Sequence, residues 1–123
     1  MKPSDFKILI ADDSMLARKK LKNCLAGLDY TNVIEAVDGE NAVELFRNEN
    51  PLLVFMDIVM PKKYGIDALK EIKTLNKDAI VVMVSSTGTK VNVADAIKAG
   101  ANDFLTKPFT VKQVYDVLEH FNK

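Results

Sequence analysis

The chain has 123 residues, with 17 basic and 17 acidic side chains and a formal net charge of zero. This length is typical of one domain with one hydrophobic core, and we expect a single domain spanning residues 1–123. Nucleic-acid-binding modules are usually strongly basic, so the balanced charge argues against one.

One cysteine and one histidine also exclude several classes of site. Cys24 cannot form an internal disulfide, and a single cysteine with a single histidine cannot complete a zinc site. No apolar run approaches the roughly 18 residues that span a bilayer. The apolar run near the start is cut off by two aspartates and does not resemble a secretory leader. We therefore expect a cytoplasmic protein with no membrane association.

Five short apolar runs, rich in β-branched residues, predict five strands. The runs are residues 7–11, 33–36, 52–56, 80–84 and 103–105. The third and fourth runs show no alternation of apolar and polar residues, which is typical of strands covered on both faces. The pattern therefore predicts a parallel sheet buried between helices.

Stretches with the helical spacing of apolar residues follow these runs. They are residues 17–28, 42–46, 66–72, 91–97 and 111–121. Asp38 is placed as the N-cap of the second stretch, and Gly100 follows the fourth. Thr110 and Gln113 form a capping box at the start of the fifth. Repeated strand–helix units imply right-handed crossovers and a doubly wound α/β fold.

In doubly wound sheets, functional groups gather beyond the carboxyl ends of the strands. Four of the five predicted strands end in polar residues that carry chemistry. They are Asp12 and Asp13 after the first strand, Asp57 after the third, Ser85 after the fourth and Lys107 after the fifth. These strands are expected to be close neighbours, so three carboxylates, a hydroxyl and an ammonium group should meet at one edge.

Three crowded carboxylates repel one another, and a divalent cation relieves that repulsion. Oxygen ligands without histidine or cysteine suit Mg²⁺ better than zinc or copper. A lysine and a hydroxyl beside a metal-bound carboxylate supply the positive charge and the donors that a transferring phosphoryl group needs. One aspartate could then act as a nucleophile and form an aspartyl phosphate.

This arrangement resembles the receiver domain of two-component response regulators, and especially the single-domain chemotaxis regulators. The resemblance covers nearly the whole chain and rests, in order, on Asp12-Asp13, Asp57 with Met60-Pro61 and Gly65, Ser85, and Lys107-Pro108-Phe109. It implies a flavodoxin-like three-layer sandwich with strand order 2-1-3-4-5. It also implies that the protein is a signalling phosphoacceptor rather than an enzyme. Such a phosphoacceptor receives its phosphoryl group from a histidine kinase or phosphotransfer protein.

The resemblance implies a role for each residue at the strand ends. Asp57 is the expected phosphoacceptor. Asp13 and Asp57 are the expected direct Mg²⁺ ligands, joined by the backbone carbonyl of Val59. Asp12 is expected to bind the metal through water, and Lys107 is expected to neutralise the phosphoryl oxygens.

Ser85 and Phe104 are the switch residues that the resemblance implies. Ser85 would donate to a phosphoryl oxygen, and its movement would leave a space into which the Phe104 ring turns. This repacks a face where effector proteins dock, made by residues 91–97, 103–105 and 111–121. The resemblance also implies a cis peptide bond between Lys107 and Pro108.

Three positions depart from the commonest pattern of the family. Ser85 stands where many members have threonine, but the hydroxyl is kept. Phe104 has no phenolic hydroxyl, so a switching step that needs this group cannot occur. Val59 is apolar where some members carry a polar side chain that helps to place the attacking water. We therefore expect slower self-dephosphorylation than a polar residue would give.

Single motifs also have simpler interpretations. Asp12-Asp13, taken alone, predicts an N-cap and a first-turn acid of the following helix. The basic run at residues 18–22 predicts a solvated helix face, or a docking surface for an acidic patch on a phosphodonor. Residues 87–89 predict a loop beside the site. The lone His120 lies far from the carboxylates in this fold, so a phosphohistidine donor must be another protein.

Other functions are compatible with the same architecture. One is a small Mg²⁺-dependent aspartyl phosphohydrolase, although the chain is short for the cap of such enzymes. Another is a nucleotide- or flavin-binding module, although no glycine-rich loop follows the first strand. The chain could also be a receiver that works unphosphorylated, or one excised from a larger regulator such as a transcription factor.

Overall fold

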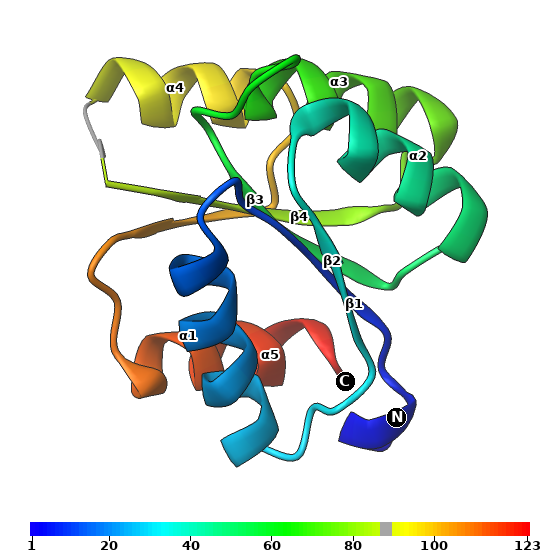
Figure 1. The fold of residues 1–123 in the computed structure, drawn as a ribbon, viewed down its shortest axis with the longest axis vertical. Coiled ribbons are helices and arrows are strands. Elements are labelled where there is room, and N and C mark those ends of the chain that lie inside the picture. The colour runs from blue at the N-terminus through cyan, green and yellow to red at the C-terminus, as the bar shows by residue number, and fades with distance from the viewer. Residues whose placement is uncertain (87–89) are drawn as a thin grey trace.

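The computed structural model describes residues 1–86 and 90–123. Five parallel strands form one sheet in the order β2-β1-β3-β4-β5. Helices α1 and α5 cover one face of the sheet, and α2, α3 and α4 cover the other (Figure 1). This confirms the predicted doubly wound fold and its strand order. The loop expected at residues 87–89 and the side chain of Val91 lie outside the described residues.

The strands occupy the predicted runs, with ends shifted by at most one residue. They are β1 (Ile8–Ala11), β2 (Val33–Ala36), β3 (Leu53–Asp57), β4 (Ile80–Ser85) and β5 (Asp103–Thr106). Asp57 pairs in register with Val84, and Ser85 pairs with Thr106. Asp57 and Ser85 are therefore the last residues of their strands and share the rigidity of the sheet.

The helices extend beyond the predicted stretches at several ends. They are α1 (Met15–Gly27), α2 (Gly39–Glu49), α3 (Gly65–Leu75), α4 (Lys90–Lys98) and α5 (Val111–Phe121), and a short 3₁₀ helix at Pro3–Asp5 precedes β1. The sequence pattern gave no sign of this 3₁₀ helix. In the parts of the chain that the structure describes, no helix has the length and apolar character needed to cross a membrane.

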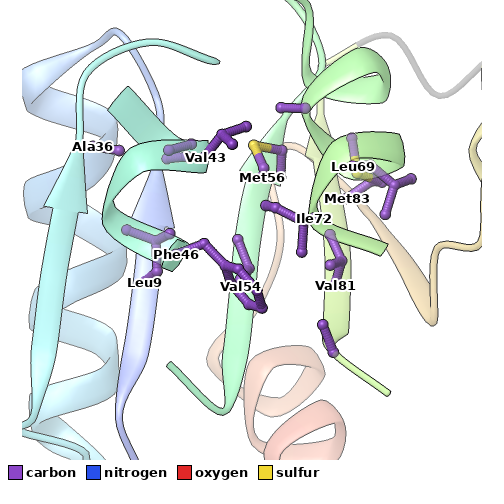
Figure 2. Close-up of a cluster of buried hydrophobic side chains, with 14 of the residues drawn as sticks. Leu9, Ala36, Val43, Phe46, Val54, Met56, Leu69, Ile72, Val81 and Met83 are labelled. Carbon is purple, nitrogen blue, oxygen red and sulfur yellow. The ribbon is translucent and has the colours of Figure 1, made fainter. Parts of the chain in front are cut away.

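Each face of the sheet has its own core, because successive side chains of a strand point to opposite faces. Under α2 and α3 lie Leu9, Val54, Met56, Val81 and Met83, packed against helix residues that include Phe46 and Ile72 (Figure 2). Under α1 and α5 lie Ile8, Ile10, Leu53, Phe55, Val82 and Val84. Burial on both faces explains why the sequences of β3 and β4 do not alternate.

Ser14 is the N-cap of α1, and its Oγ accepts a hydrogen bond from the N–H of Ala17 at 3.2 Å. The interpretation of Asp12-Asp13 as the N-cap and first-turn acid of this helix is therefore wrong. The cap predicted at Asp38 is confirmed by its 2.7 Å hydrogen bond from the N–H of Asn41. The capping box of α5 is also present.

Gly65 begins α3 in direct contact with the backbone of Asp57. Its N–H donates to the carbonyl of Ile58 at 2.7 Å. A Cβ atom at Gly65 would overlap the carbonyl oxygen of Asp57. The absence of a side chain therefore allows the loop after β3 to fold back tightly over the end of that strand.

Candidate functional site

The carboxyl ends of β1 and β3 bring three aspartates together. One carboxylate oxygen from each of Asp12, Asp13 and Asp57 lies within 4.8 Å of the others. Asp12 is buried, with 6% of its surface exposed, Asp57 is half-buried, and Asp13 is exposed. The sequence prediction that these three carboxylates meet at one edge of the sheet is therefore confirmed.

Lys107 completes the cluster from the loop after β5. Its Nζ atom lies 2.7 Å from Oδ2 of Asp12 and 3.7 Å from Oδ2 of Asp57. The N–H of Lys107 donates to the carbonyl of Ser85 at 2.8 Å, which ties this loop to the end of β4. The peptide bond between Lys107 and Pro108 is cis, as expected from the resemblance.

The surroundings of Asp57 disfavour its charge. Burial raises the pKa of Asp57 above its ordinary value, and the nearby carboxylate of Asp12 raises it further, with a smaller effect from Asp13. The ammonium of Lys107 and a 2.9 Å hydrogen bond from the N–H of Ile58 lower this pKa, but the net direction is upward. Additional positive charge would therefore stabilise the ionised site.

The donor set fits Mg²⁺. Asp12, Asp13 and Asp57 offer only hard carboxylate oxygens, which Mg²⁺ prefers. The cluster includes no histidine or cysteine ligand of the kind that zinc and copper favour. Asp13 is exposed, so the cluster has a solvent-facing side, and a cation that keeps several waters needs such a side.

The other residues singled out from the sequence surround this cluster at different depths. Ser85 is buried, with 2% of its surface exposed, and directly follows the residue that pairs with Asp57. Phe104 is half-buried, pairs in register with Met83, and packs against the core under α2 and α3. Val59 is 62% exposed in the loop beyond Asp57.

An apolar cavity of about 400 Å³ adjoins the cluster between α1 and the loop after β5. Asp12, Asp57 and Lys107 line it together with apolar residues that include Ile10, Leu21, Phe55, Val84 and Phe109. Asp12, Asp57 and Lys107 therefore face an apolar surface on this side of the cluster.

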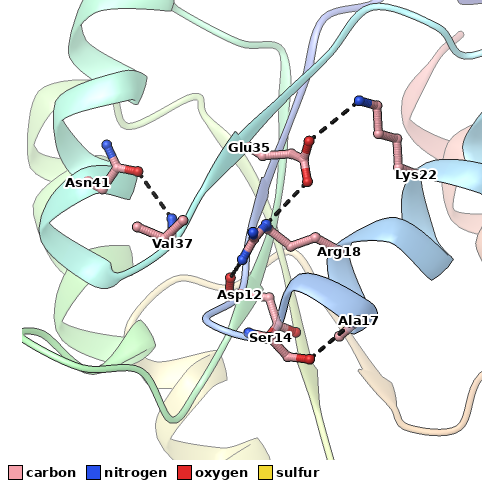
Figure 3. Close-up of polar contacts among 8 residues, drawn as sticks. All are labelled: Asp12, Ser14, Ala17, Arg18, Lys22, Glu35, Val37 and Asn41. Carbon is pink, nitrogen blue, oxygen red and sulfur yellow. Dashed lines mark hydrogen bonds and ion pairs between the residues drawn. The ribbon is translucent and has the colours of Figure 1, made fainter.

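Arg18 belongs to the site, although sequence reasoning placed it on a solvated face. That prediction is correct for the three lysines of the basic run, which are exposed. It is wrong for Arg18, whose side chain is 11% exposed because its guanidinium reaches back to the carbonyl of Asp12 (Figure 3). The sequence feature that could have indicated this contact is the position of Arg18 one turn after the Ser14 cap. Helical side chains lean toward the preceding turn, so the Arg18 side chain can reach the residues just before α1.

Comparison with known proteins identifies the family. The sequence matches the response regulator receiver domain over residues 8–119. The chain belongs to this family. The receiver domain is 45% identical to the chemotaxis protein CheY of Bacillus subtilis, over 95% of each chain. It is 39% identical to the CheY of Thermotoga maritima, over 95% of this chain and 98% of that protein.

The structure of the receiver domain is also similar to a chain in the crystal structure of the CheX-CheY-BeF3-Mg²⁺ complex from Borrelia burgdorferi. The TM-score is 0.89, the sequence identity is 36%, and all of both chains is covered. Family membership confirms the resemblance found in the sequence and disfavours the phosphohydrolase and nucleotide-binding alternatives. The Mg²⁺ in that crystal structure agrees with the donor set of the acidic cluster.

Proposed function

We propose that this receiver domain is a phosphorylation switch, in which Asp57 accepts a phosphoryl group from the phosphohistidine of a kinase or phosphotransfer protein. The observation that carries the proposal is the meeting of Asp57 with two other carboxylates and with Lys107. Carboxylates alone would support only cation binding. The ammonium of Lys107 beside Asp57 adds a positive charge to that of a bound cation, and a transferring phosphoryl group needs such positive charge around its oxygens.

In the proposed reaction, a carboxylate oxygen of Asp57 attacks the phosphorus of the phosphohistidine. A phosphorus–oxygen bond to Asp57 forms as the phosphorus–nitrogen bond breaks, and the imidazole nitrogen keeps the electron pair and takes a proton from solvent. The Nζ of Lys107 and the hydroxyl of Ser85 would donate to the phosphoryl oxygens. The Nζ of Lys107, which contacts Asp12 in this structure, would then move partly away from Asp12 to contact the phosphoryl oxygens.

We assign the cation to Asp13, Asp57 and the backbone carbonyl of Val59 as direct ligands, and to Asp12 through water. When bound, Mg²⁺ would neutralise charge between the acceptor and the phosphoryl oxygens. The exposure of Asp13 and the burial of Asp12 support this division, because Asp12 already accepts hydrogen bonds from Lys107 and from the N–H of Ser14.

The output of the switch is assigned to the face formed by α4, β5 and α5. Ile97, Val111 and Tyr115 expose 62%, 57% and 45% of their surfaces there. Phe104 lies half-buried in β5 and pairs with Met83, and Met83 is two residues before Ser85 in β4. A movement of Ser85 would therefore occur close to Phe104 and to this face. Exposed apolar side chains on the two helices that flank β5 suit a protein effector.

We further propose that residues 1–123 form one receiver domain in the cytoplasm, acting as a signalling phosphoacceptor in the control of motility. The relatives named as chemotaxis proteins, which this chain matches over nearly their whole length, support that role. The balanced charge supports protein partners rather than nucleic acid for this domain.

Intact-mass measurement after incubation with acetyl phosphate and Mg²⁺ tests the proposal. The wild-type protein should gain one phosphoryl mass, and Asp57→Asn should gain none. Asp116→Asn is the matched control, since it removes an exposed carboxylate on α5 and should leave the gain unchanged. A wild-type protein that gains no mass, or a gain that persists in Asp57→Asn, would contradict the proposal.

A further inference from the structure

The guanidinium of Arg18 connects α1 to the acidic site and to the neighbouring strand. Its Nη1 donates to the backbone carbonyl of Asp12 at 2.7 Å, and its Nε donates to Oε1 of Glu35 in β2 at 3.1 Å (Figure 3). Lys22 contacts the other oxygen of Glu35 at 3.4 Å. Glu35 therefore orients the guanidinium, and the guanidinium holds a backbone atom of the site.

The carbonyl of Asp12 belongs to the same planar peptide group as the N–H of Asp13. Other contacts hold Asp12 itself: its N–H donates to the carbonyl of Ala36 at 3.1 Å, and its Oδ1 accepts from the N–H of Ser14 at 2.9 Å. The Arg18 contact acts on the peptide group that follows. The orientation of that group sets the direction in which the chain enters Asp13, the exposed member of the cluster.

We propose that Arg18 is a positioning residue for the cation site, which fixes the Asp13 carboxylate relative to those of Asp12 and Asp57. This inference rests on the proposed function, because it concerns the cation assigned to the same carboxylates. The Arg18 side chain is only 11% exposed, so water competes little for its hydrogen bonds. A charged donor makes these bonds stronger than bonds between neutral groups.

Arginine is required for this role because its donors point in two fixed directions. The planar guanidinium reaches a carbonyl with Nη1 and a carboxylate with Nε at the same time. A lysine at this position would keep the charge but would present a single ammonium, which cannot reproduce the fork. Arg18→Lys therefore separates the effect of geometry from the effect of charge.

The test is isothermal titration calorimetry of the unphosphorylated protein with Mg²⁺ alone. Arg18→Lys should raise the dissociation constant for Mg²⁺ about tenfold, which corresponds to about 1.4 kcal/mol. Lys22→Met is the matched control, since Lys22 contacts Glu35 but not Asp12. It should change the dissociation constant by less than about twofold, within the spread of exposed ion pairs. Glu35→Gln should weaken Mg²⁺ binding to an intermediate degree, because it keeps an acceptor for Nε but removes its charge.

Urea unfolding of the metal-free variants separates a positioning role from a merely structural one. If Arg18→Lys unfolds more easily but the folded protein binds Mg²⁺ with the wild-type dissociation constant, the proposal is overturned. If Arg18→Lys does not fold, Glu35→Gln carries the same test, and unchanged Mg²⁺ binding in that variant overturns it. A wild-type protein that fails to bind Mg²⁺ would instead contradict the proposed function on which the inference rests.

Discussion

Lys107 and Asp12 lie 95 positions apart in the sequence, and Nζ of the lysine is 2.7 Å from Oδ2 of the aspartate. The contact joins the loop after β5 to the end of β1, across the carboxyl edges of β3 and β4 between them. The same ammonium lies 3.7 Å from Asp57. One lysine therefore offsets part of the repulsion among the carboxylates until a cation or a phosphoryl group arrives.

Replacement of Lys107 by methionine should destabilise the metal-free protein by about 2 kcal/mol, because the buried carboxylate of Asp12 would lose a charged donor. Urea unfolding at neutral pH in the presence of a chelator measures this change. Lys112→Met is the control: its ion pair with Asp116 is solvent-exposed, so no measurable change is expected. Equal stability of wild-type protein and Lys107→Met would show that the pair does not stabilise the site.

Asp57 should destabilise the metal-free fold at neutral pH. Its pKa is raised in the folded state by burial and by Asp12, so the folded protein binds this proton more tightly than the unfolded chain does. The contribution of Asp57 to stability therefore falls as the pH rises from about 4, the ordinary aspartate value, through the folded pKa. Asp57→Asn should raise the free energy of unfolding at pH 7 on the order of 1 kcal/mol, or about 4 °C in Tm.

Thermal unfolding with a chelator, recorded at several pH values, tests this expectation. The stabilisation by Asp57→Asn should be present at pH 7 and should disappear below about pH 3, where the wild-type carboxyl is protonated in both states. A variant that is less stable than the wild type at pH 7 would contradict the assigned sign.

Saturating Mg²⁺ should make the wild-type protein more stable than Asp57→Asn at pH 7. A cation bound only by the folded state at 100 times its dissociation constant stabilises that state by about 2.7 kcal/mol. The Tm of the wild-type protein should therefore rise with Mg²⁺ concentration, and Asp57→Asn should gain less because it offers one carboxylate fewer. Equal gains for the two proteins would show that Mg²⁺ binds away from Asp57.

Gly65→Ala should damage both the fold and the cation site. The new methyl group would overlap the backbone carbonyl of Asp57, so the loop after β3 must move, at a cost of about 1 to 3 kcal/mol. Gly27→Ala is the matched control, because no atom lies within 4 Å of a Cβ built there. Urea unfolding and Mg²⁺ titration should show losses for Gly65→Ala alone. Unchanged Mg²⁺ affinity would mean that the loop relaxes without disturbing Asp57.

Val59→Asn should accelerate loss of the phosphoryl group several-fold. Val59 is 62% exposed in the loop beyond the proposed acceptor, so a polar side chain fits there and can help to orient a water molecule. The decay of phosphorylated protein after removal of acetyl phosphate measures the rate. Val59→Ala, which opens the same space without a polar group, should decay at the wild-type rate. Equal rates for Val59→Asn and Val59→Ala would eliminate the water-placing role.

The position of the carboxylates could be predicted from the sequence because two simple regularities coincide. Apolar runs locate the strands, and parallel strands end at one edge, so Asp12, Asp57 and Lys107 had to lie near one another. The same reasoning gave the caps at Asp38 and Thr110, which depend only on neighbouring residues.

Contacts that depend on the path of a long side chain could not be predicted in this way. Arg18 lies in a run of basic residues whose pattern indicates solvent, and only the fold shows its guanidinium turned back to the carbonyl of Asp12. The tight approach of Gly65 to Asp57 likewise depends on the course of a loop. Backbone contacts between a loop and a strand end leave no periodic signal in the sequence.

A crystal structure of the protein with Mg²⁺ and beryllofluoride would test the assignment of the site most directly. We expect one Mg²⁺ at about 2.1 Å from oxygens of Asp13, Asp57 and the carbonyl of Val59, with beryllofluoride on the carboxylate of Asp57. Lys107 should then contact a fluoride. Beryllofluoride on another carboxylate, or Mg²⁺ bound away from these aspartates, would contradict the assignment.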